Sequence, residues 1–398
     1  MKSKKWLTTT SILSISLVGG VATIITGILP QMEQEFASVS TTMVEWLVTA
    51  ANISALVTLL LNPLLTKRFG IKKVVVVGLW VAALTGAIPA FTHSYGLVLG
   101  SRLVLGLGLG LFSPHAIGLI AHTYHGELRA RLLGYQTGLG ALGIAIFLAL
   151  AGLVVTVNWR GVFLLYLLLG AVAVLAARAL PEPATIQYTD KEELHKLPFS
   201  RWLLVGLAFV TYLLIWGVQL KLPRLFIEHA FGNAELANWT LSAMNMGGLI
   251  AGLTFGRVHQ HLHQYTLTLG YAGAALSVVA LLTTKNPAVA VAAAVFFNFI
   301  YSYTGPYLVY RSQLDLPTGQ IDAMSSWLTM ATIISAFFAP PVWNLLGLIG
   351  PGAVTDNVLL WIAGGLGLIA ITVTVVFRRQ ARPILETTMQ DNRKRSHP

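Results

Sequence analysis

Residues 100–115 read Gly-Ser-Arg-Leu-Val-Leu-Gly-Leu-Gly-Leu-Gly-Leu-Phe-Ser-Pro-His, which places an arginine, a series of glycines and a proline within one apolar segment. From Leu97 to Ile120 no other Asp, Glu, Lys or Arg occurs, and a helix of this length crosses the roughly 30 Å hydrocarbon core of a bilayer. Arg102 is therefore expected inside the membrane. Because an arginine there costs about 2.5–3.5 kcal/mol, it should face a polar cavity or a partner. The glycines allow another helix to pack closely on this segment.

The composition extends this interpretation to the whole chain. Of its 398 residues 55% are hydrophobic and only 10% are charged, and the mean hydropathy is +0.72. These values predict an all-α integral membrane protein and exclude an ordinary soluble domain. The absence of cysteine excludes disulfide and thiolate chemistry. The first apolar run, Trp6 to Leu29, is too long for a signal peptide and is interpreted as the first span.

Breaks in hydropathy predict twelve transmembrane helices in two groups of six. The first six lie near 7–29, 43–65, 74–92, 96–121, 132–157 and 161–179, and the second six near 202–222, 237–257, 265–284, 287–310, 323–347 and 357–377. The predicted organisation is an N-terminal bundle (1–180), a central cytoplasmic loop (181–200), a C-terminal bundle (201–378) and a basic cytoplasmic tail (379–398).

Charge fixes the expected orientation. Most of the 26 Lys and Arg residues lie on one side of the predicted spans, which by the positive-inside rule places both termini in the cytoplasm of a cell-membrane protein. This bias, together with anionic lipid head groups as partners, explains the net charge of +11, so the charge gives no reason to expect a nucleic acid partner.

An internal repeat relates the two halves. A shift of 193 positions superposes Leu29-Pro30 on Leu222-Pro223, and the same shift aligns Glu35, Ala37, Trp46, Ala50 and Asn52 with identical residues. The halves are therefore expected to be two six-helix units in parallel order, related by a pseudo-two-fold axis along the membrane normal, with a central cavity.

At this point the chain resembles the major facilitator superfamily over its whole length. The family pattern of an arginine followed by Gly-x-Gly in the fourth span is matched by Arg102, Gly106 and Gly108. The loop between spans two and three, Pro63 to Lys73, resembles the family's gating loop. The resemblance gives a gating role to Lys67, Arg68, Gly70 and Lys72, although Lys67 reverses the charge of the family's aspartate.

Two further segments bear on the kind of transport. In the fifth span, Gly143 to Gly152 keeps only the outer glycines of the family's antiporter signature, which makes antiport a weaker inference than the fold. The next turn, Trp159-Arg160-Gly161-Val162-Phe163, resembles a Trp-Arg-x-x-Phe sequence of bacterial efflux permeases.

In this architecture spans one, four, seven and ten line the cavity, so their polar and aromatic residues are the candidates for substrate binding. These are Thr23, Thr26, Arg102, Tyr212, Trp216, Gln219, Asn298 and Tyr301. Such a wall suits a neutral or amphiphilic solute, held by stacking and a few hydrogen bonds. The alternative is structural, because threonines bond back to their own helix and tyrosines occupy interfacial belts.

Arg102 and His115 are the candidates for proton coupling. The ordinary pKa of histidine lies near neutrality, whereas packing is the alternative role for His115 and snorkelling the alternative for Arg102. Glu45 and Glu228 lie toward the outer ends of their spans, so no buried carboxylate is expected. His259, His261 and His263 alternate in a turn but have no Asp or Cys alongside, so no metal site is predicted.

The sequence therefore predicts a secondary transporter that works by alternating access, with proton-coupled efflux of a small amphiphilic drug or sugar as its first interpretation. An uptake carrier or an uncoupled facilitator for a small neutral solute is the alternative within transport. A non-transporting receptor on the same fold is the alternative from another class. Neither His-Glu-x-x-His nor Gly-x-Ser-x-Gly lies on a span, so no enzyme, catalytic residue or cofactor is expected.

Overall fold

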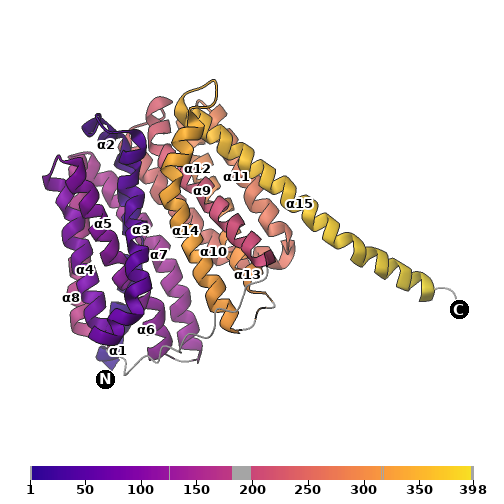
Figure 1. Cartoon of the computed structure of the whole chain (residues 1–398), viewed down its shortest axis with the longest axis horizontal. Coiled ribbons are helices and arrows are strands. Elements are labelled where there is room, and N and C mark those ends of the chain that lie inside the picture. Colours follow the sequence, from indigo (N-terminus) through magenta and orange to yellow (C-terminus); the bar gives the residue numbers. More distant parts are fainter. Residues whose placement is uncertain (1, 125, 182–198, 315, 317, 396–398) are drawn as a thin grey trace.

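The computed structural model describes residues 2–124, 126–181, 199–314, 316 and 318–395. All regular structure within these residues is helical, and the N-terminal and C-terminal helices form two groups that lie side by side (Figure 1). Eleven helices of the described part are long and apolar enough to cross a membrane, judged by length and composition. The predicted all-α membrane fold is confirmed.

The helices of the N-terminal group are α1 (Lys2–Leu17), η1 (Val21–Ile28), α2 (Leu29–Glu35), α3 (Thr41–Phe69), α4 (Ile71–Ala87), η2 (Ile88–Phe91), α5 (Tyr95–Phe112), α6 (His115–Thr123), α7 (Gly126–Val155), η3 (Trp159–Leu167) and α8 (Leu168–Ala179). Those of the C-terminal group are α9 (Phe199–Glu228), α10 (Ala234–Leu262), α11 (Tyr265–Thr283), α12 (Pro287–Tyr301), α13 (Thr304–Gln313), α14 (Thr318–Gly347) and α15 (Val354–Arg395). The predicted central loop lies mostly outside the described residues.

Helix α10 occupies the predicted span 237–257 but is not among the eleven helices that pass by composition. Its sequence includes Asn238, Asn245 and Arg257, which lower its hydropathy. Because α10 packs between α7 and α12, much of its surface is covered by protein rather than lipid. A helix in that position does not need an apolar side chain at every turn.

The first span is not one continuous helix. Helix α1 ends before Gly19 and Gly20, and the chain continues as the 3₁₀ helix η1 and then as α2, with Pro30 in its first turn. A Cβ atom on Gly20 would lie 2.3 Å from the side chain of Ile144 on α7, so a larger residue would have to displace that side chain. The span therefore changes its winding where α7 crosses it.

The glycines of α5 bring two neighbours into close contact, as the sequence predicted. A Cβ on Gly106 would lie 2.1 Å from the carbonyl oxygen of Ala51 on α3, and one on Gly110 would lie 2.2 Å from that of Ala55. Gly108 points the other way, and its Cβ would lie 2.7 Å from the Gly78 carbonyl oxygen of α4. Helix α5 is thus held between α3 and α4 at backbone distance.

Helix α15 continues beyond its membrane-spanning part as far as Arg395 and projects away from the bundle (Figure 1). The predicted tail is therefore mainly a helical extension of the last span. The predicted boundaries of the two bundles at 180 and 201 stay predictions, because the residues between Pro181 and Phe199 lie outside the described part.

Candidate functional site

A group of polar residues joins the two helix groups at one end of the molecule. Glu45 belongs to α3 of the N-terminal group, whereas Lys221 on α9 and Asn344 on α14 belong to the C-terminal group. Glu45 and Lys221 are each only 1% exposed. We call these three residues the gate triad, and the end of the molecule where they lie the Glu45 end.

The gate triad forms a closed set of hydrogen bonds. Lys221 Nζ lies 2.5 Å from Glu45 Oε1 and 2.7 Å from Asn344 Oδ1, while Asn344 Nδ2 donates to Glu45 Oε2 at 2.6 Å. Both carboxylate oxygens therefore accept a bond, and the ammonium has two acceptors. A buried ion pair is stable only when its remaining groups are satisfied in this way.

Beside the gate triad, Trp46 fastens α3 to α14. Its ring stacks on Phe337 with centroids 5.4 Å apart and planes 6° apart, and its Nε1 donates to the Phe337 carbonyl oxygen at 3.1 Å. That carbonyl is available because Pro341, four residues later, has no N–H to donate. Pro341 of the C-terminal bundle thus leaves the Phe337 carbonyl oxygen free to accept a hydrogen bond from Trp46 of the N-terminal bundle.

The gate triad lies among further charges of the same two bundles. Arg224 on α9 bonds Glu228 on its own helix at 2.7 Å and reaches Glu33 on α2 at 3.5 Å. These side chains are partly exposed, unlike those of Glu45 and Lys221. The Glu45 end therefore carries two sets of charges: the buried pair of Glu45 and Lys221, and the partly exposed side chains around Arg224.

The expectation that no carboxylate is buried is wrong. Glu45 does lie toward the end of its span, but helices of the opposite bundle cover it there, so proximity to a helix end does not mean contact with water. The sequence contained a signal for this. Lys221 stands between Leu220 and Leu222 in an apolar run, and an unpaired lysine there would be costly.

The second seam between the bundles, α7 against α10, carries no charge at the contacts described. Ser242 Oγ donates to the Ala145 carbonyl oxygen at 2.7 Å. Near the Glu45 end, Gly27 lies so close to Asn238 that a Cβ would be 2.2 Å from its Oδ1. The contacts described for this seam are close packing and a neutral hydrogen bond.

Replacement of Trp46 by phenylalanine tests the contact between α3 and α14. The stacked ring stays, but the Phe337 carbonyl loses its donor, which costs about 1–3 kcal/mol when the group stays buried. We expect a lower melting temperature of the purified protein. Trp361→Phe is the control, because Trp361 donates to Ile349 within the C-terminal bundle. Equal shifts in the two variants would contradict a special role for the contact between the bundles.

Arg102, predicted to face a cavity or a partner, is fully buried and has partners. Its Nε donates to the Leu47 carbonyl oxygen at 2.8 Å, Nη1 to Tyr166 Oη at 2.7 Å and Nη2 to the Ala22 carbonyl oxygen at 2.6 Å. The guanidinium carbon also lies 5.2 Å from the centre of the Tyr166 ring. Arg102 therefore links the first, second, fourth and sixth spans of its bundle.

His115 and the two candidate threonines make hydrogen bonds inside the N-terminal bundle. Thr23 Oγ1 donates to the Gly20 carbonyl oxygen and Thr26 Oγ1 to that of Thr23, the local bonding named as the alternative. His115 is buried, and its Nε2 lies 2.9 Å from Asn62 Oδ1. None of these contacts tests binding or coupling, which stay predictions.

Tyr212 is the candidate that lines a cavity. This cavity, of about 210 Å³, is surrounded by α9, α13 and α14, and its described lining holds no charged residue: Ala208, Tyr212, Gly305, Leu308, Val309, Ser325, Leu328, Thr329 and Thr332. Trp216 and Gln219 follow Tyr212 on the same helical face and are partly exposed. The structure thus groups the three candidates of the seventh span.

Asn298 and Tyr301 are buried within the C-terminal bundle. Asn298 Nδ2 donates to the Met244 carbonyl oxygen of α10, and Tyr301 stacks on Phe297 with ring centroids 5.9 Å apart. In this conformation both side chains therefore pack between helices instead of lining the cavity that Tyr212 lines.

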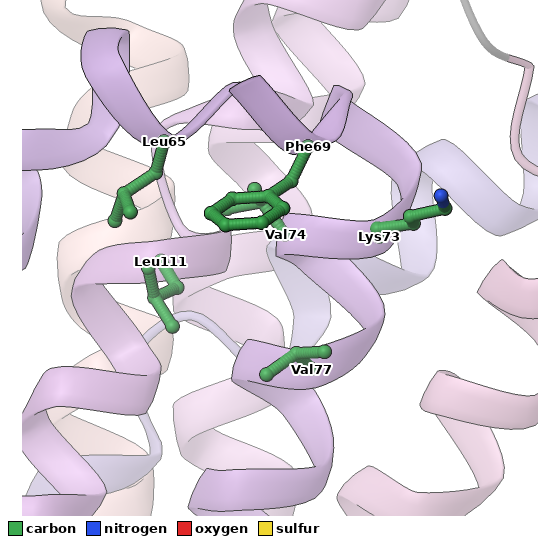
Figure 2. Close-up of a pocket in the computed structure, with 6 residues that line it drawn as sticks. All are labelled: Leu65, Phe69, Lys73, Val74, Val77 and Leu111. Carbon is green, nitrogen blue, oxygen red and sulfur yellow. The ribbon is translucent and has the colours of Figure 1, made fainter. Parts of the chain in front are cut away.

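The predicted gating loop is a tight turn between α3 and α4. Gly70 has φ 83° and ψ 151°, a conformation almost confined to glycine, and its N–H caps α3. Lys67 and Arg68 are exposed, and the Arg68 guanidinium lies over the Phe69 ring. A cavity of about 350 Å³ lies beside this turn, lined by Leu65, Phe69, Lys73, Val74, Val77 and Leu111 (Figure 2).

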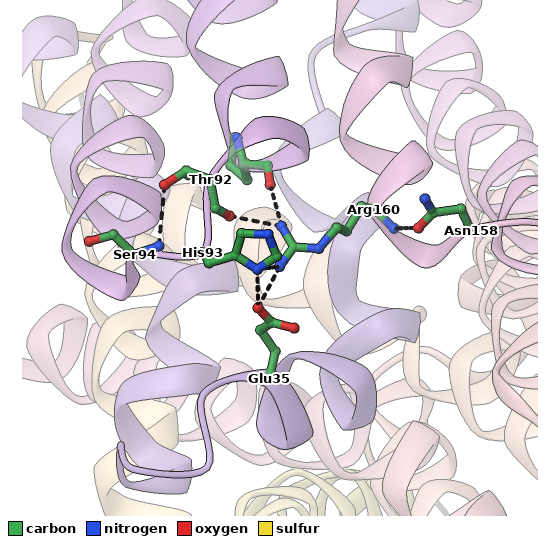
Figure 3. Close-up of polar contacts among 7 residues, drawn as sticks. Glu35, Thr92, His93, Ser94, Asn158 and Arg160 are labelled. Carbon is green, nitrogen blue, oxygen red and sulfur yellow. Dashed lines mark hydrogen bonds and ion pairs between the residues drawn. The ribbon is translucent and has the colours of Figure 1, made fainter.

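The Trp-Arg-x-x-Phe segment has a clear role in packing. Arg160 Nη2 lies 2.5 Å from Glu35 Oε1, which also contacts His93, and Nη1 donates to the Thr92 carbonyl oxygen at 2.8 Å (Figure 3). The guanidinium lies 4.9 Å from the Trp159 ring centre. Arg160 thus ties α2 to two turns of the same bundle.

No group of three or more metal-ligating side chains occurs in the described part of the chain. His259 instead packs against aromatic rings, with the Phe255 ring stacked at 5.5 Å and the Tyr310 ring at 4.9 Å. Ring packing at the end of α10 therefore accounts for His259, whereas His261 and His263 are exposed.

Comparison with known proteins adds family and fold. The family model described as Major Facilitator Superfamily matches residues 11–340. The Methylenomycin A resistance protein of Bacillus subtilis is 28% identical over 50% of this chain and 42% of its own length. The Tetracenomycin C resistance and export protein of Streptomyces glaucescens is 24% identical over 56% and 40%. The matched part therefore spans about two fifths of these relatives.

Among solved structures, a D-xylose–proton symporter superposes with a TM-score of 0.74, at 16% identity over 92% of this chain and 97% of that one. At this identity the similarity shows the fold alone. All three similar proteins are named as transport or resistance proteins and none as an enzyme.

Proposed function

This chain belongs to the Major Facilitator Superfamily, and we propose that it exports a small amphiphilic solute across the cell membrane by alternating access, in exchange for protons. The proposed orientation has both termini and the Lys67 turn in the cytoplasm, as the positive-inside rule predicts. The Glu45 end then faces the outside. The structure corresponds to a state in which contacts between the bundles close the outer side.

The gate triad is the observation that carries this proposal. Its members come from both bundles, so the bundles cannot part on the outer side while Glu45 and Lys221 stay bonded. Alternating access requires such a contact to form and break in each cycle. A permanent structural ion pair would more naturally lie within one bundle, as the contact between Arg160 and Glu35 does.

Glu45 is our candidate for the proton site, in place of a role for Arg102 or His115. A proton on Glu45 removes the negative charge that holds Lys221, so acid on the outer side favours opening. The charged neighbours are Lys221, Arg224 and Glu228 on α9 and Glu33 on α2, while α14 contributes the neutral Asn344. Loss of the proton restores the charge of Glu45, so its contact with Lys221 forms again and the outer side closes.

The substrate class follows from the cavity that Tyr212 lines. One phenol, three hydroxyl groups and several apolar side chains suit a solute that is partly polar and carries no obligatory charge. Trp216 and Gln219 extend the same face of α9. The resistance and export named for the relatives support efflux as the direction. Arg102 is assigned a positioning role, because each of its three side-chain nitrogens donates a hydrogen bond within the bundle.

The test is solute-driven pH change in proteoliposomes that contain the purified protein, screened over amphiphilic drugs and sugars. Thr332→Trp fills the cavity and should abolish the response, whereas Thr283→Trp, at an exposed position of α11, should not. Solute flux without proton movement would show an uncoupled facilitator and overturn coupling. Solute binding without flux would show a receptor and overturn transport.

A further inference from the structure

A second cavity lies in the C-terminal bundle, at the end of α9 remote from Lys221. It has a volume of about 400 Å³ and is enclosed by α9, α11, α13 and α15. Its lining consists of Ser200, Arg201, Leu203, Leu204, Leu207, Leu267, Tyr307, Arg311, Thr372, Val373, Val376 and Phe377. It shares no lining residue with the cavity of Tyr212, so it is a separate site.

One side of this cavity is positively charged. Arg201 donates to the carbonyl oxygens of Arg311 and Leu314, at 2.8 and 2.7 Å, which fixes its guanidinium at the end of α13. The Arg311 side chain is exposed, and among the described residues no carboxylate forms an ion pair with either arginine. Two cations thus lie at this cavity, and none of its described lining residues is acidic.

The other side of the cavity is apolar and adjoins the lipid-facing surface. Leu203 and Val376, which line it, are 60% and 44% exposed. Farther along α15, Leu368 and Ile371 are 66% and 65% exposed, so this helix presents a continuous apolar surface to the surrounding hydrocarbon. A molecule in the cavity can therefore extend along α15 without leaving an apolar environment.

We propose that this cavity binds one anionic phospholipid of the adjacent leaflet. The phosphate would lie against Arg311 and Arg201, with Ser200 as a further donor, and an acyl chain would follow the leucines of α9 and the valines of α15. Basic cavities between spans at the cytoplasmic surface are the sites where anionic head groups bind. The site lies among four helices of one bundle, and it does not depend on what the protein transports.

The charge and the apolar wall of the cavity favour an anionic phospholipid over a zwitterionic lipid or a hydrated ion. A zwitterionic lipid carries the same single phosphate, but its ammonium group competes for that phosphate and is repelled by the two arginines. A fully hydrated ion gains nothing from the apolar wall, whereas an acyl chain gains about 0.8 kcal/mol for each CH₂ group it buries. Only an anionic amphiphile satisfies both sides of the cavity.

Native mass spectrometry of the full chain in detergent, titrated with phosphatidylglycerol or phosphatidylethanolamine, tests this proposal. We expect one tightly bound phosphatidylglycerol and at least a tenfold preference over phosphatidylethanolamine. Arg311→Ala should weaken binding about tenfold, and Arg311→Lys should restore most of it. Val373→Trp, which fills the apolar part and leaves both charges, should weaken binding as well.

Arg178→Ala is the matched control, because Arg178 is an exposed arginine at the end of α8, outside the cavity. An equal loss in Arg178→Ala and Arg311→Ala would show diffuse attraction to a basic surface and overturn the proposal. Unchanged binding in Val373→Trp would overturn the cavity as the site. Binding of a single-chain fatty acid but no phosphatidylglycerol would assign the site to free anionic amphiphiles and overturn the phospholipid.

Discussion

Replacing Glu45 with glutamine is expected to open the outer side of the protein and to abolish proton coupling. The side chain keeps its shape, but Lys221 then lies buried opposite a neutral amide. Removal of one charge from a buried pair costs about 3–5 kcal/mol. A loss of this size lowers the population of the closed state relative to the open state by about a hundredfold or more.

Distance measurements between two spin labels report the opening directly. The chain has no cysteine, so Ser38→Cys on one bundle and Ala353→Cys on the other provide a clean pair at exposed positions of the Glu45 end. We expect the long distance to dominate in Glu45→Gln at every pH. In the unmodified protein the short distance should dominate, because the gate triad is intact.

Glu228→Gln is the control for this experiment. It removes a carboxylate from the same end, but Glu228 is exposed and bonds an arginine of its own helix. Its distances should match those of the parent, and its proteoliposomes should still move protons. If Glu45→Gln stays closed and keeps solute-driven pH change, Glu45 is neither the gate nor the proton site.

Replacing Arg102 with alanine is expected to destabilise the N-terminal bundle strongly. Three donors vanish together, and two backbone carbonyls and the Tyr166 hydroxyl lose them in the bilayer interior. Each hydrogen bond to a charged group contributes about 1.5–3 kcal/mol. Arg102→Lys should fail as well, because one ammonium cannot reach three acceptors held by different helices.

The measurement is thermal unfolding in detergent, followed by solute binding below the melting temperature. Tyr166→Phe removes one of the three acceptors and should lower stability by less. Arg68→Ala, at an exposed position of the turn before α4, should change it little. A stable Arg102→Ala variant that fails to bind solute would instead support Arg102 as a substrate-binding residue, the role that the sequence predicted.

The spans were predictable because hydropathy is a local property of the chain. Each helix from α3 to α15 that crosses the fold overlaps a predicted segment, and the glycines of α5 make the close contacts that their spacing implied. Even α10, with its asparagines, was found, because polar or charged residues break the hydropathy on either side of it. Local sequence patterns thus suffice to predict a residue's surroundings where contact with lipid requires an apolar side chain, or where a close neighbouring backbone requires glycine.

The gate triad was not predictable in the same way. Lys221 lies 176 positions from Glu45, and Asn344 lies 299 positions from it, so no local pattern joins them. Arg102 shows the same limit in another form. A partner was expected, but two of its partners are backbone carbonyls, which any residue type provides. Thr23 and Thr26 have helical spacing, yet their hydroxyls bond the 3₁₀ turn of η1.

The repeat gives the gate triad a counterpart across the pseudo-two-fold axis, and that counterpart is neutral. The 193-position shift carries Glu45 onto Asn238 and Ile28 onto Lys221, and Asn238 does pack tightly against Gly27. One proton therefore loosens only one of the two seams. We expect the bundles to separate by a hinge motion about the contact between α7 and α10. The edge that carries Glu45 should then move farthest.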